Sequence, residues 1–187
     1  MGYRLIIIGG SAGSFQVVNR IISQMPSDFK IPVVLVLHRL RHIKHGFKEA
    51  LSQKSNLPVI EPEDKSSLKP GRIYLAPANY HLYIEVNGRI ALSTEEPVNH
   101  SRPAIDLAFT SAAVCFREKT AGIILSGANK DGAEGLKAIK DYGGMTIVQD
   151  PAEAQIPAMP YATLQKVKNV DHIMNTNEII DFLKSIN

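Results

Sequence analysis

Three runs of the chain are dominated by aliphatic residues, and these do not alternate with polar ones. The runs are Leu5–Ile8, Pro32–His38 and Thr120–Gly127. A strand covered on both faces shows a continuous apolar run, whereas a strand with one solvated face alternates. The pattern therefore predicts three buried strands of a parallel sheet.

Helical periodicity occupies much of the chain between these runs. An apolar stripe repeating every three or four residues predicts helices at Phe15–Met25 and Ala104–Phe116. Asp150–Pro160 is predicted as a loop. Further helices are predicted at Gly46–Ser52, Ala133–Tyr142, Tyr161–Val167 and Asn177–Ser185, and further strands at Val59–Ile60, Arg72–Pro77 and Met145–Val148. The alternation is typical of an α/β fold with a doubly wound, mainly parallel, Rossmann-like sheet.

One pair of strands departs from this parallel scheme. His81–Val86 and Arg89–Ser93 flank the dipeptide Asn87-Gly88. Asn-Gly between alternating strands favours a two-residue type I′ turn, which needs positive φ at both positions. We therefore expect an antiparallel hairpin.

Composition and charge limit the class of protein. The 187 residues are 44% hydrophobic and 21% charged, which predicts one domain over residues 1–187 with a sizeable core. The net charge of +3, with no dense Lys/Arg arm, gives no indication of nucleic-acid binding. No apolar stretch approaches the ~20 residues that span a bilayer. The single cysteine, Cys115, suits a reducing compartment. We expect a cytoplasmic protein without membrane insertion.

The first apolar run leads into a glycine-rich turn, Gly9–Ser14. The dinucleotide fingerprint Gly-x-Gly-x-x-Gly does not fit Gly9, Gly10 and Gly13, and the second strand ends in His38 rather than in an acidic residue. The Gly-Lys-Ser/Thr ending of a phosphate-binding loop is also missing. A nucleotide site is therefore disfavoured.

The same turn matches the nucleophile elbow Gly-x-Ser-x-Gly, with Ser11 at its centre. The alternative is that Ser11 caps the following helix while the glycines pack that helix against the strand. On the motif alone the second interpretation is the more common one, because short motifs often match by chance.

The ends of the three buried strands change this balance. Ser11 and His38 each follow one of these strands, and Asp131 lies in the loop after the third. Active sites of open α/β sheets lie outside the carboxyl ends of the strands. The three residues are the parts of a nucleophile, its general base and the carboxylate that orients the base. Their order disfavours a standard α/β-hydrolase, which has Ser, Asp/Glu, His, but triads are recognised by geometry.

Six short motifs follow one another along the chain: Ile8–Gly13, His38, Pro70-Gly71…Ala76-Pro77…His81, Ser101-Arg102-Pro103…Asp106, Ser126-Gly127…Asp131-Gly132-Ala133…Gly135 and Gln149-Asp150-Pro151…Met159-Pro160. As an ordered set they resemble the catalytic domain of the CheB family of chemotaxis receptor methylesterases. The resemblance runs from about Arg4 to about Val170.

The resemblance implies hydrolysis of γ-glutamyl methyl esters on methyl-accepting chemotaxis receptors, often with deamidation of receptor glutamines, and with no metal or cofactor. It gives Ser11 the role of nucleophile, His38 that of base and Asp131 that of its partner. Family members often have Thr where this chain has Ala12, and many have Met where it has Ala128. We expect main-chain N–H groups near these two positions to bind the oxyanion.

Two further features bear on substrate binding. Arg102 either orients the substrate or pairs with Asp106, four residues further on. The basic segment Arg39–Lys48 is either a solvated helix face or a surface for a glutamate-rich receptor helix.

The usual family member has an N-terminal receiver domain, whereas this sequence starts directly at the catalytic strand. We expect either a stand-alone form, whose receiver domain or methyltransferase is encoded separately, or a piece of a larger protein. The alternative function is that of a non-catalytic CheB-like domain that binds a receptor or a signalling partner.

Overall fold

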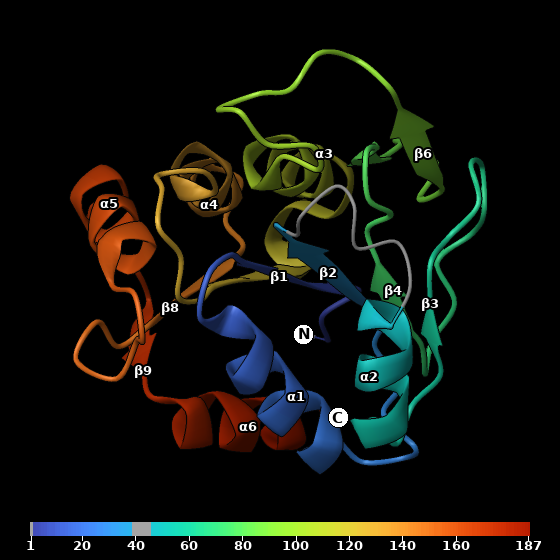
Figure 1. Cartoon of the computed structure of the whole chain (residues 1–187), viewed down its shortest axis with the longest axis horizontal. Coiled ribbons are helices and arrows are strands. Elements are labelled where there is room, and N and C mark those ends of the chain that lie inside the picture. The colour runs from blue at the N-terminus through green and yellow to red at the C-terminus, as the bar shows by residue number, and fades with distance from the viewer. Residues whose placement is uncertain (1, 39–45) are drawn as a thin grey trace.

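A computed structural model describes residues 2–38 and 46–187, and it has the predicted α/β architecture (Figure 1). The strands of the main sheet are β1 (Leu5–Gly10), β2 (Val33–Leu37), β3 (Val59–Ile60), β4 (Ile73–Leu75), β7 (Thr120–Ile124), β8 (Met145–Gln149) and β9 (His172–Met174). They lie in the order β3-β4-β2-β1-β7-β8-β9, and every neighbouring pair is parallel. The winding reverses between β1 and β7, so this is a doubly wound sheet.

Helices cover both faces of the sheet, as Figure 1 shows with α3 and α4 above it and α1, α2 and α6 below. The helices are α1 (Ser14–Gln24), α2 (Phe47–Lys54), α3 (Ile105–Phe116), α4 (Ala133–Asp141), α5 (Ala158–Lys166) and α6 (Thr176–Ser185), with a 3₁₀ turn at Arg117–Lys119. Side chains of β1 alternate between the two cores: Ile6 and Ile8 pack with α1, α2 and α6, whereas Leu5 and Ile7 pack with α3 and α4. Burial on both faces explains why β1 lacks polar residues.

The predicted hairpin is present as β5 (His81–Ile84) and β6 (Ile90–Ser93), paired antiparallel in a separate two-stranded sheet. The predicted type I′ turn is wrong, because Asn87 does not have positive φ. Gly88 alone does, at 78°, and its N–H donates to Glu85 O at 2.8 Å. Glu85 N–H also donates to Arg89 O at 2.8 Å, so three residues, 86–88, connect the last bonded pair, and the final one is a glycine in the left-handed region.

Two other predictions need correction. The loop predicted at Asp150–Pro160 ends earlier, because α5 begins at Ala158 and takes Pro160 into its first turn, where a missing N–H leaves no helical bond unmade. The short strand β9 was not predicted. It pairs with β8 at the sheet edge and is half exposed, so it lacks the apolar run of the inner strands. In the described part of the chain, no helix has both the length and the apolar character to cross a membrane.

Candidate active site

The three candidate residues follow three neighbouring strands, β2, β1 and β7. Ser11 directly follows β1, and its N–H donates to Ser126 O beyond the end of β7 at 2.9 Å. His38 directly follows β2, and its N–H donates to Gly10 O at 3.0 Å. The hydrogen bonding between neighbouring strands thus continues past the strand ends to Ser11 and His38. They lie at the carboxyl edge of the sheet where the winding reverses, the usual place of an α/β active site.

The turn at Ser11 is held by its own backbone and by Ser126. Gly13 has φ 83°, and a Cβ on it would lie 2.6 Å from Ser126 Oγ. The Ser126 hydroxyl donates to Ala12 O at 2.9 Å, and Ser14 Oγ donates to Ser11 O at 2.7 Å. Ser11 itself makes no side-chain cap of α1, whose first residue is Ser14. The helix-cap alternative for Ser11 is therefore wrong.

His38 and Asp131 form a direct pair. His38 Nε2 lies 2.8 Å from Asp131 Oδ2, and the imidazole is 12% exposed while the carboxylate is fully buried. The N–H groups of Ile105 and Asp106, at the start of α3, also donate to Asp131 at 2.7 and 3.0 Å. Burial alone raises the pKa of Asp131, but the bond from His38 and these two amides outweigh it, and the pKa is lowered. Asp131 is thus a buried carboxylate in its ionised form at neutral pH.

The second ring nitrogen of His38 faces Ser101, which the sequence placed in a motif but to which it gave no role. Ser101 Oγ lies 3.4 Å from His38 Nδ1. Because the Asp131 carboxylate accepts the proton of Nε2, Nδ1 is the nitrogen that is free to accept a proton. Within residues 2–38 and 46–187, no hydrogen bond joins the Ser11 hydroxyl to His38. The structure therefore brings the His38–Asp131 pair together, with Ser11 on the neighbouring strand end.

The two positions expected to bind the oxyanion lie on exposed turns at this edge. Ala12 follows Ser11, and Ala128 lies in the loop between β7 and α4. In the part of the chain that the structure describes, neither amide N–H donates a hydrogen bond. The Ala128 loop is anchored at Gly127, whose N–H donates to Ile156 O and whose carbonyl accepts from Met159 N–H. Both amides are thus available to a ligand at the edge.

Arg102 does not pair with Asp106, so that alternative is wrong. Its Nη1 donates to Thr94 O at 2.7 Å and to Glu95 O at 2.9 Å. Asp106 instead accepts the N–H groups of Gly132 and Gly135, both at 2.8 Å. Arg102 therefore fixes the loop that follows β6, while Asp106 is turned toward α4.

Sequence reasoning also placed Gln149 and Ser126, beneath the site, in motifs without giving either a role. Gln149 is fully buried, and its side-chain oxygen accepts Ser126 N–H at 2.9 Å. Both residues stand at the end of an apolar strand. The same position drew attention to His38, so it could also have pointed to Ser126 and Gln149. The basic segment Arg39–Lys48 remains an untested prediction, because residues 39–45 lie outside the described residues.

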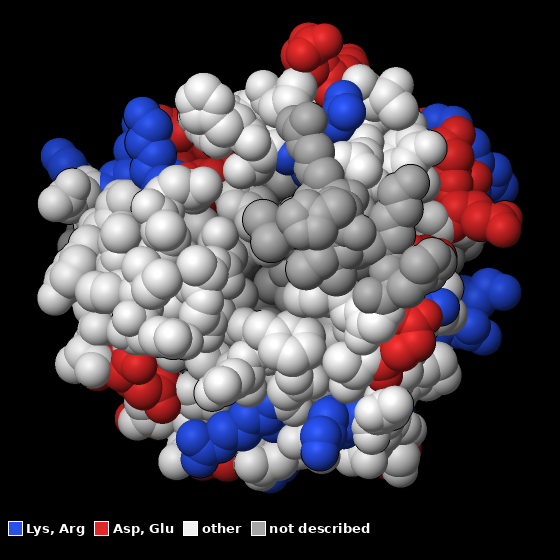
Figure 2. Space-filling view, viewed as in Figure 1, with Lys and Arg blue, Asp and Glu red and all other residues white. Residues whose placement is uncertain are grey.

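An uncharged surface adjoins the edge. No charged residue occurs from Ala154 to Leu164, and Figure 2 shows a wide area without charged side chains over α5 and the connection that precedes it. Hydrogen bonds of Gly127 with Ile156 and Met159 attach this segment to the loop after β7. The surface beside the Ala128 loop therefore suits a partner segment with few charges of its own.

The chain is an α/β domain with a doubly wound sheet, and a serine, a histidine and an aspartate follow adjoining strands at the edge where a hydrolase of this class has its active site. The family model described as CheB methylesterase matches residues 6–183. The chain belongs to the CheB methylesterase family.

Individual relatives agree with this family. A protein of Leptospira interrogans, provisionally named a protein-glutamate methylesterase/protein-glutamine glutaminase, is 39% identical over 181 residues, which cover 97% of this chain and 93% of that protein. A protein of Carboxydothermus hydrogenoformans, named protein-glutamate methylesterase/protein-glutamine glutaminase 1, is 38% identical, and the match covers 87% of this chain and 49% of that protein. The crystal structure of the Thermotoga maritima CheB methylesterase catalytic domain superposes with a TM-score of 0.92 at 30% identity and covers 100% of both chains.

Proposed function

We propose that this protein removes methyl esters from glutamate side chains of chemotaxis receptors, and deamidates receptor glutamines, with Ser11, His38 and Asp131 as its catalytic residues. The observation that carries the proposal is the 2.8 Å pair between His38 Nε2 and Asp131 Oδ2 beside the Ser11 turn. A buried carboxylate that orients a histidine next to a serine is the arrangement that activates a hydroxyl nucleophile.

In the first step, Ser11 Oγ attacks the ester carbonyl carbon while His38 Nδ1 takes the hydroxyl proton. Asp131 keeps Nε2 protonated and stabilises the imidazolium that forms. The C–O bond to the methoxy group then breaks, His38 returns the proton to it, and methanol leaves an acyl-serine. Water attacks the acyl carbon in the second step, again with His38 as base, and glutamate and Ser11 are regenerated. With a glutamine the leaving group is ammonia.

Three further roles complete the proposed mechanism. The unbonded N–H groups of Ala12 and Ala128 bind the oxyanion, and removing one such donor typically costs about 2.7–4 kcal/mol in the barrier. The Ser11 hydroxyl turns to His38 Nδ1 when substrate binds, since catalytic hydrogen bonds often form only in the substrate complex. Arg102 acts on the substrate through its loop, because its Nη1 is bonded to Thr94 and Glu95 carbonyls.

The substrate is the cytoplasmic, glutamate-rich helix of a methyl-accepting chemotaxis receptor, and the protein acts in the cytoplasm. The uncharged segment Ala154–Leu164 meets the apolar side of the receptor helix, while the basic segment Arg39–Lys48 meets its glutamates.

A fluorophosphonate probe, which labels activated serines, tests the assignment together with methanol release from a methylated receptor fragment. We expect labelling and methanol release by the wild type and by Ser23→Ala, a control on the exposed side of α1. Ser11→Ala loses both. Labelling or methanol release by Ser11→Ala would refute the nucleophile, and an unlabelled wild type would support the non-catalytic alternative.

A further inference from the structure

The helices α3 and α4 begin next to each other, and neither is capped by its own N-cap residue. The N-cap of α3 is Ala104 and that of α4 is Gly132, so neither has a side chain that accepts the free N–H groups of the first turn. Unpaired N–H groups at a buried helix start are unfavourable. Partners must therefore come from elsewhere in the chain.

Two aspartates supply these partners reciprocally. Asp131, which precedes α4, accepts N–H groups of the first turn of α3, from Ile105 at 2.7 Å and Asp106 at 3.0 Å. Asp106, in the first turn of α3, accepts the N–H groups of Gly132 and Gly135 at the start of α4, both at 2.8 Å through Oδ1. Each carboxylate thus caps the helix next to the other.

Glycines make this approach possible. A Cβ on Gly135 would lie 2.5 Å from Phe109 Cβ and 3.0 Å from Asp106 Cα, so only a residue without a side chain allows α4 to come this close to α3. A Cβ on Gly132, which has φ 99°, would lie 2.9 Å from Ile105 Cγ2. The two N–H groups that donate to Asp106 therefore belong to glycines that allow close contact with α3.

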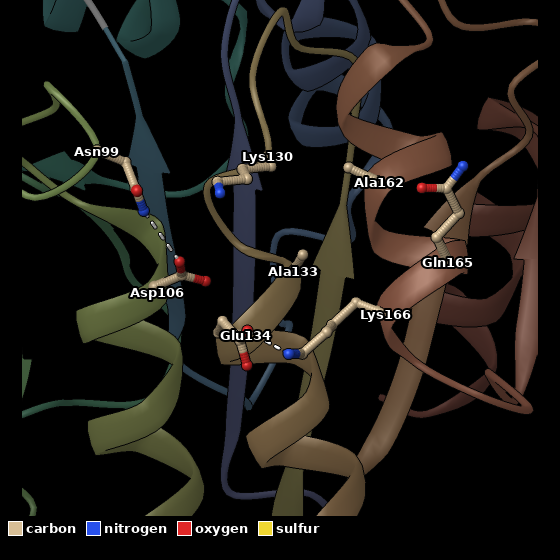
Figure 3. Close-up of a pocket in the computed structure, with 8 residues that line it drawn as sticks. All are labelled: Asn99, Asp106, Lys130, Ala133, Glu134, Ala162, Gln165 and Lys166. Carbon is tan, nitrogen blue, oxygen red and sulfur yellow. Dashed lines mark hydrogen bonds and ion pairs between the residues drawn. The ribbon is translucent and has the colours of Figure 1, made fainter.

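The other oxygen of Asp106 faces away from these bonds. Asp106 Oδ2 lies 3.4 Å from Asn99 Nδ2, at the wall of a cleft of about 540 Å³ (Figure 3). Figure 3 shows Lys130 above this wall, and Glu134 paired with Lys166 below it. Among the described residues, Asp106 makes no hydrogen bond to Ser11 or His38. Any effect it has on those two residues passes through its neighbours: through Asp131, or through Asn99, whose carbonyl accepts from Ser101 Oγ beside His38 Nδ1.

We propose that Asp106 is a positioning residue, which fixes the loop before α4 so that Asp131 meets His38 Nε2. The proposal rests on the catalytic role of Asp131 proposed above. Asp131 is bound to α3 through its side chain and to α4 through the chain, so its place depends on how the two helix starts are joined. Asp106 holds the start of α4 against α3 by accepting the N–H groups of Gly132 and Gly135. A misplacement of about 1 Å in a catalytic constellation can cost about 10²-fold in rate.

The first test compares substitutions of Asp106 in the hydrolysis of a methylated receptor fragment. Asp106→Ala lowers kcat about 10²-fold with KM changed less than about two-fold. Asp106→Asn keeps an oxygen for both N–H groups and retains kcat within about five-fold of the wild type. Asp106→Glu keeps the charge but moves the carboxylate by one methylene, and it loses kcat. If Asp106→Ala does not fold, the test is the difference in kcat between Asp106→Asn and Asp106→Glu. Equal kcat for these two variants overturns the proposal.

Asn175→Ala is the matched control. Asn175 caps α6 through bonds from Asn177 N–H at 2.9 Å and Glu178 N–H at 3.1 Å, next to the edge strand β9. This variant should lose stability, measured as Tm, and keep kcat. A folded Asp106→Ala that loses only Tm, as the control does, would show a purely structural role.

A double-mutant cycle then asks whether Asp106 acts through Asp131. In an Asp131→Asn background, the further change Asp106→Ala should lower kcat by less than about two-fold, because the pair to be positioned is already lost. A full additional loss in that background would overturn the inference. If Asp131→Asn alone keeps wild-type kcat, the proposed function fails instead, so the two failures are distinguishable.

Discussion

Ser101 presents its hydroxyl to Nδ1 of His38 at 3.4 Å, the ring nitrogen that Asp131 leaves free. The imidazole is therefore held at both nitrogens by groups far apart in the sequence. This arrangement requires the neutral ring to carry its proton on Nε2. In the proposed mechanism, the nitrogen beside Ser101 is then the one that receives the proton of Ser11.

The tautomer of His38 is a direct prediction. In protein labelled with ¹⁵N-histidine and held above the pH at which the imidazole protonates, two-bond ¹H–¹⁵N correlations should show Nε2 protonated and Nδ1 bare. Asp131→Asn should weaken this preference, because an amide no longer attracts the Nε2 proton as a carboxylate does.

His81 provides an internal control in the same spectra. Its Nδ1 accepts Ala104 N–H at 3.2 Å, and its Nε2 lies 3.0 Å from Glu96 O, away from Asp131. Its signals should stay those of the Nε2–H form in both proteins. A His38 that carries its proton on Nδ1 in the wild type would contradict the proposed route of the proton.

Gly13→Ala should reduce activity as well as stability. The alanine would have to adopt φ 83°, which L residues rarely do. Its Cβ would lie 2.6 Å from Ser126 Oγ and 2.9 Å from Gln155 Cβ, so the Ser11 turn must shift. We expect kcat/KM to fall by about 10-fold or more. Gly143→Ala is the control, because Gly143 has φ 80° after α4 and an added Cβ there meets only Glu118 Cβ, at an ordinary 3.7 Å. It should lose about 1–2 kcal/mol of stability through the left-handed backbone alone and keep its activity.

The sequence predicted the parts of the site because each stands where an apolar strand ends. Ser11, His38 and Asp131 could be placed at one edge from the buried runs before them, without any knowledge of contacts. Their partners could not be found in this way. Ser101 reaches the site through a loop, and although Ser126 ends an apolar run, its bonds to Ala12 and Ile156 join it to other loops. Hydrogen bonds between loops depend on tertiary packing rather than on periodicity.

The errors in the fold have the same origin. A hairpin follows from Asn-Gly, but its turn type depends on which residue takes positive φ, and in the structure only Gly88 does. The partner of Arg102 was sought four residues away on a helix, yet Arg102 precedes α3 and its Nη1 binds two carbonyls of the loop. Edge strand β9 lacks the apolar signal of a buried strand.

Asp106 should make stability fall as the pH rises through the range from about 4 to about 6. Burial is the main cause that raises its pKa from 3.8 to about 6, and the Asp131 charge adds to it. Below pH 3.8 the folded and unfolded chains both hold the proton. Between the two pKa values only the folded chain holds it, so the free energy of unfolding declines as the pH rises.

Urea unfolding from pH 4 to pH 8 tests this linkage, with Asp106→Asn as the comparison. The variant cannot titrate at this position, so the decline due to Asp106 should disappear. Among the described residues, the other titratable groups around Asp106 are Asp131 with its partner His38, Lys130, and the paired Glu134 and Lys166. They stay in both proteins, and the lowered pKa of Asp131 places its own contribution below pH 3.8. Equal slopes for the two proteins would contradict the prediction.

Gly135→Ala should destabilise the fold although it replaces glycine with a better helix former. In an open helix the change would add about 0.5–1 kcal/mol of stability. Here the Cβ would meet Phe109 Cβ at 2.5 Å, and overpacking of this kind typically costs about 1–3 kcal/mol. Thermal unfolding measures the change, and Gly2→Ala, with nothing within 4 Å of its Cβ, should leave Tm unchanged. A raised Tm for Gly135→Ala would show that α3 and α4 separate readily.

The reciprocal caps of α3 and α4 also bear on how the chain folds. Neither helix can complete its first turn from its own segment, so both starts are finished only when residues 105–106 and 131–135 meet. These segments are 25 to 29 residues apart in the chain, whereas the His38–Asp131 bond joins residues 93 apart, on either side of β1. Contacts of longer range form later, so Asp131 is positioned first and reaches His38 afterwards. Recovery of hydrolysis during refolding should therefore mark the end of the process, after most of the secondary structure has formed.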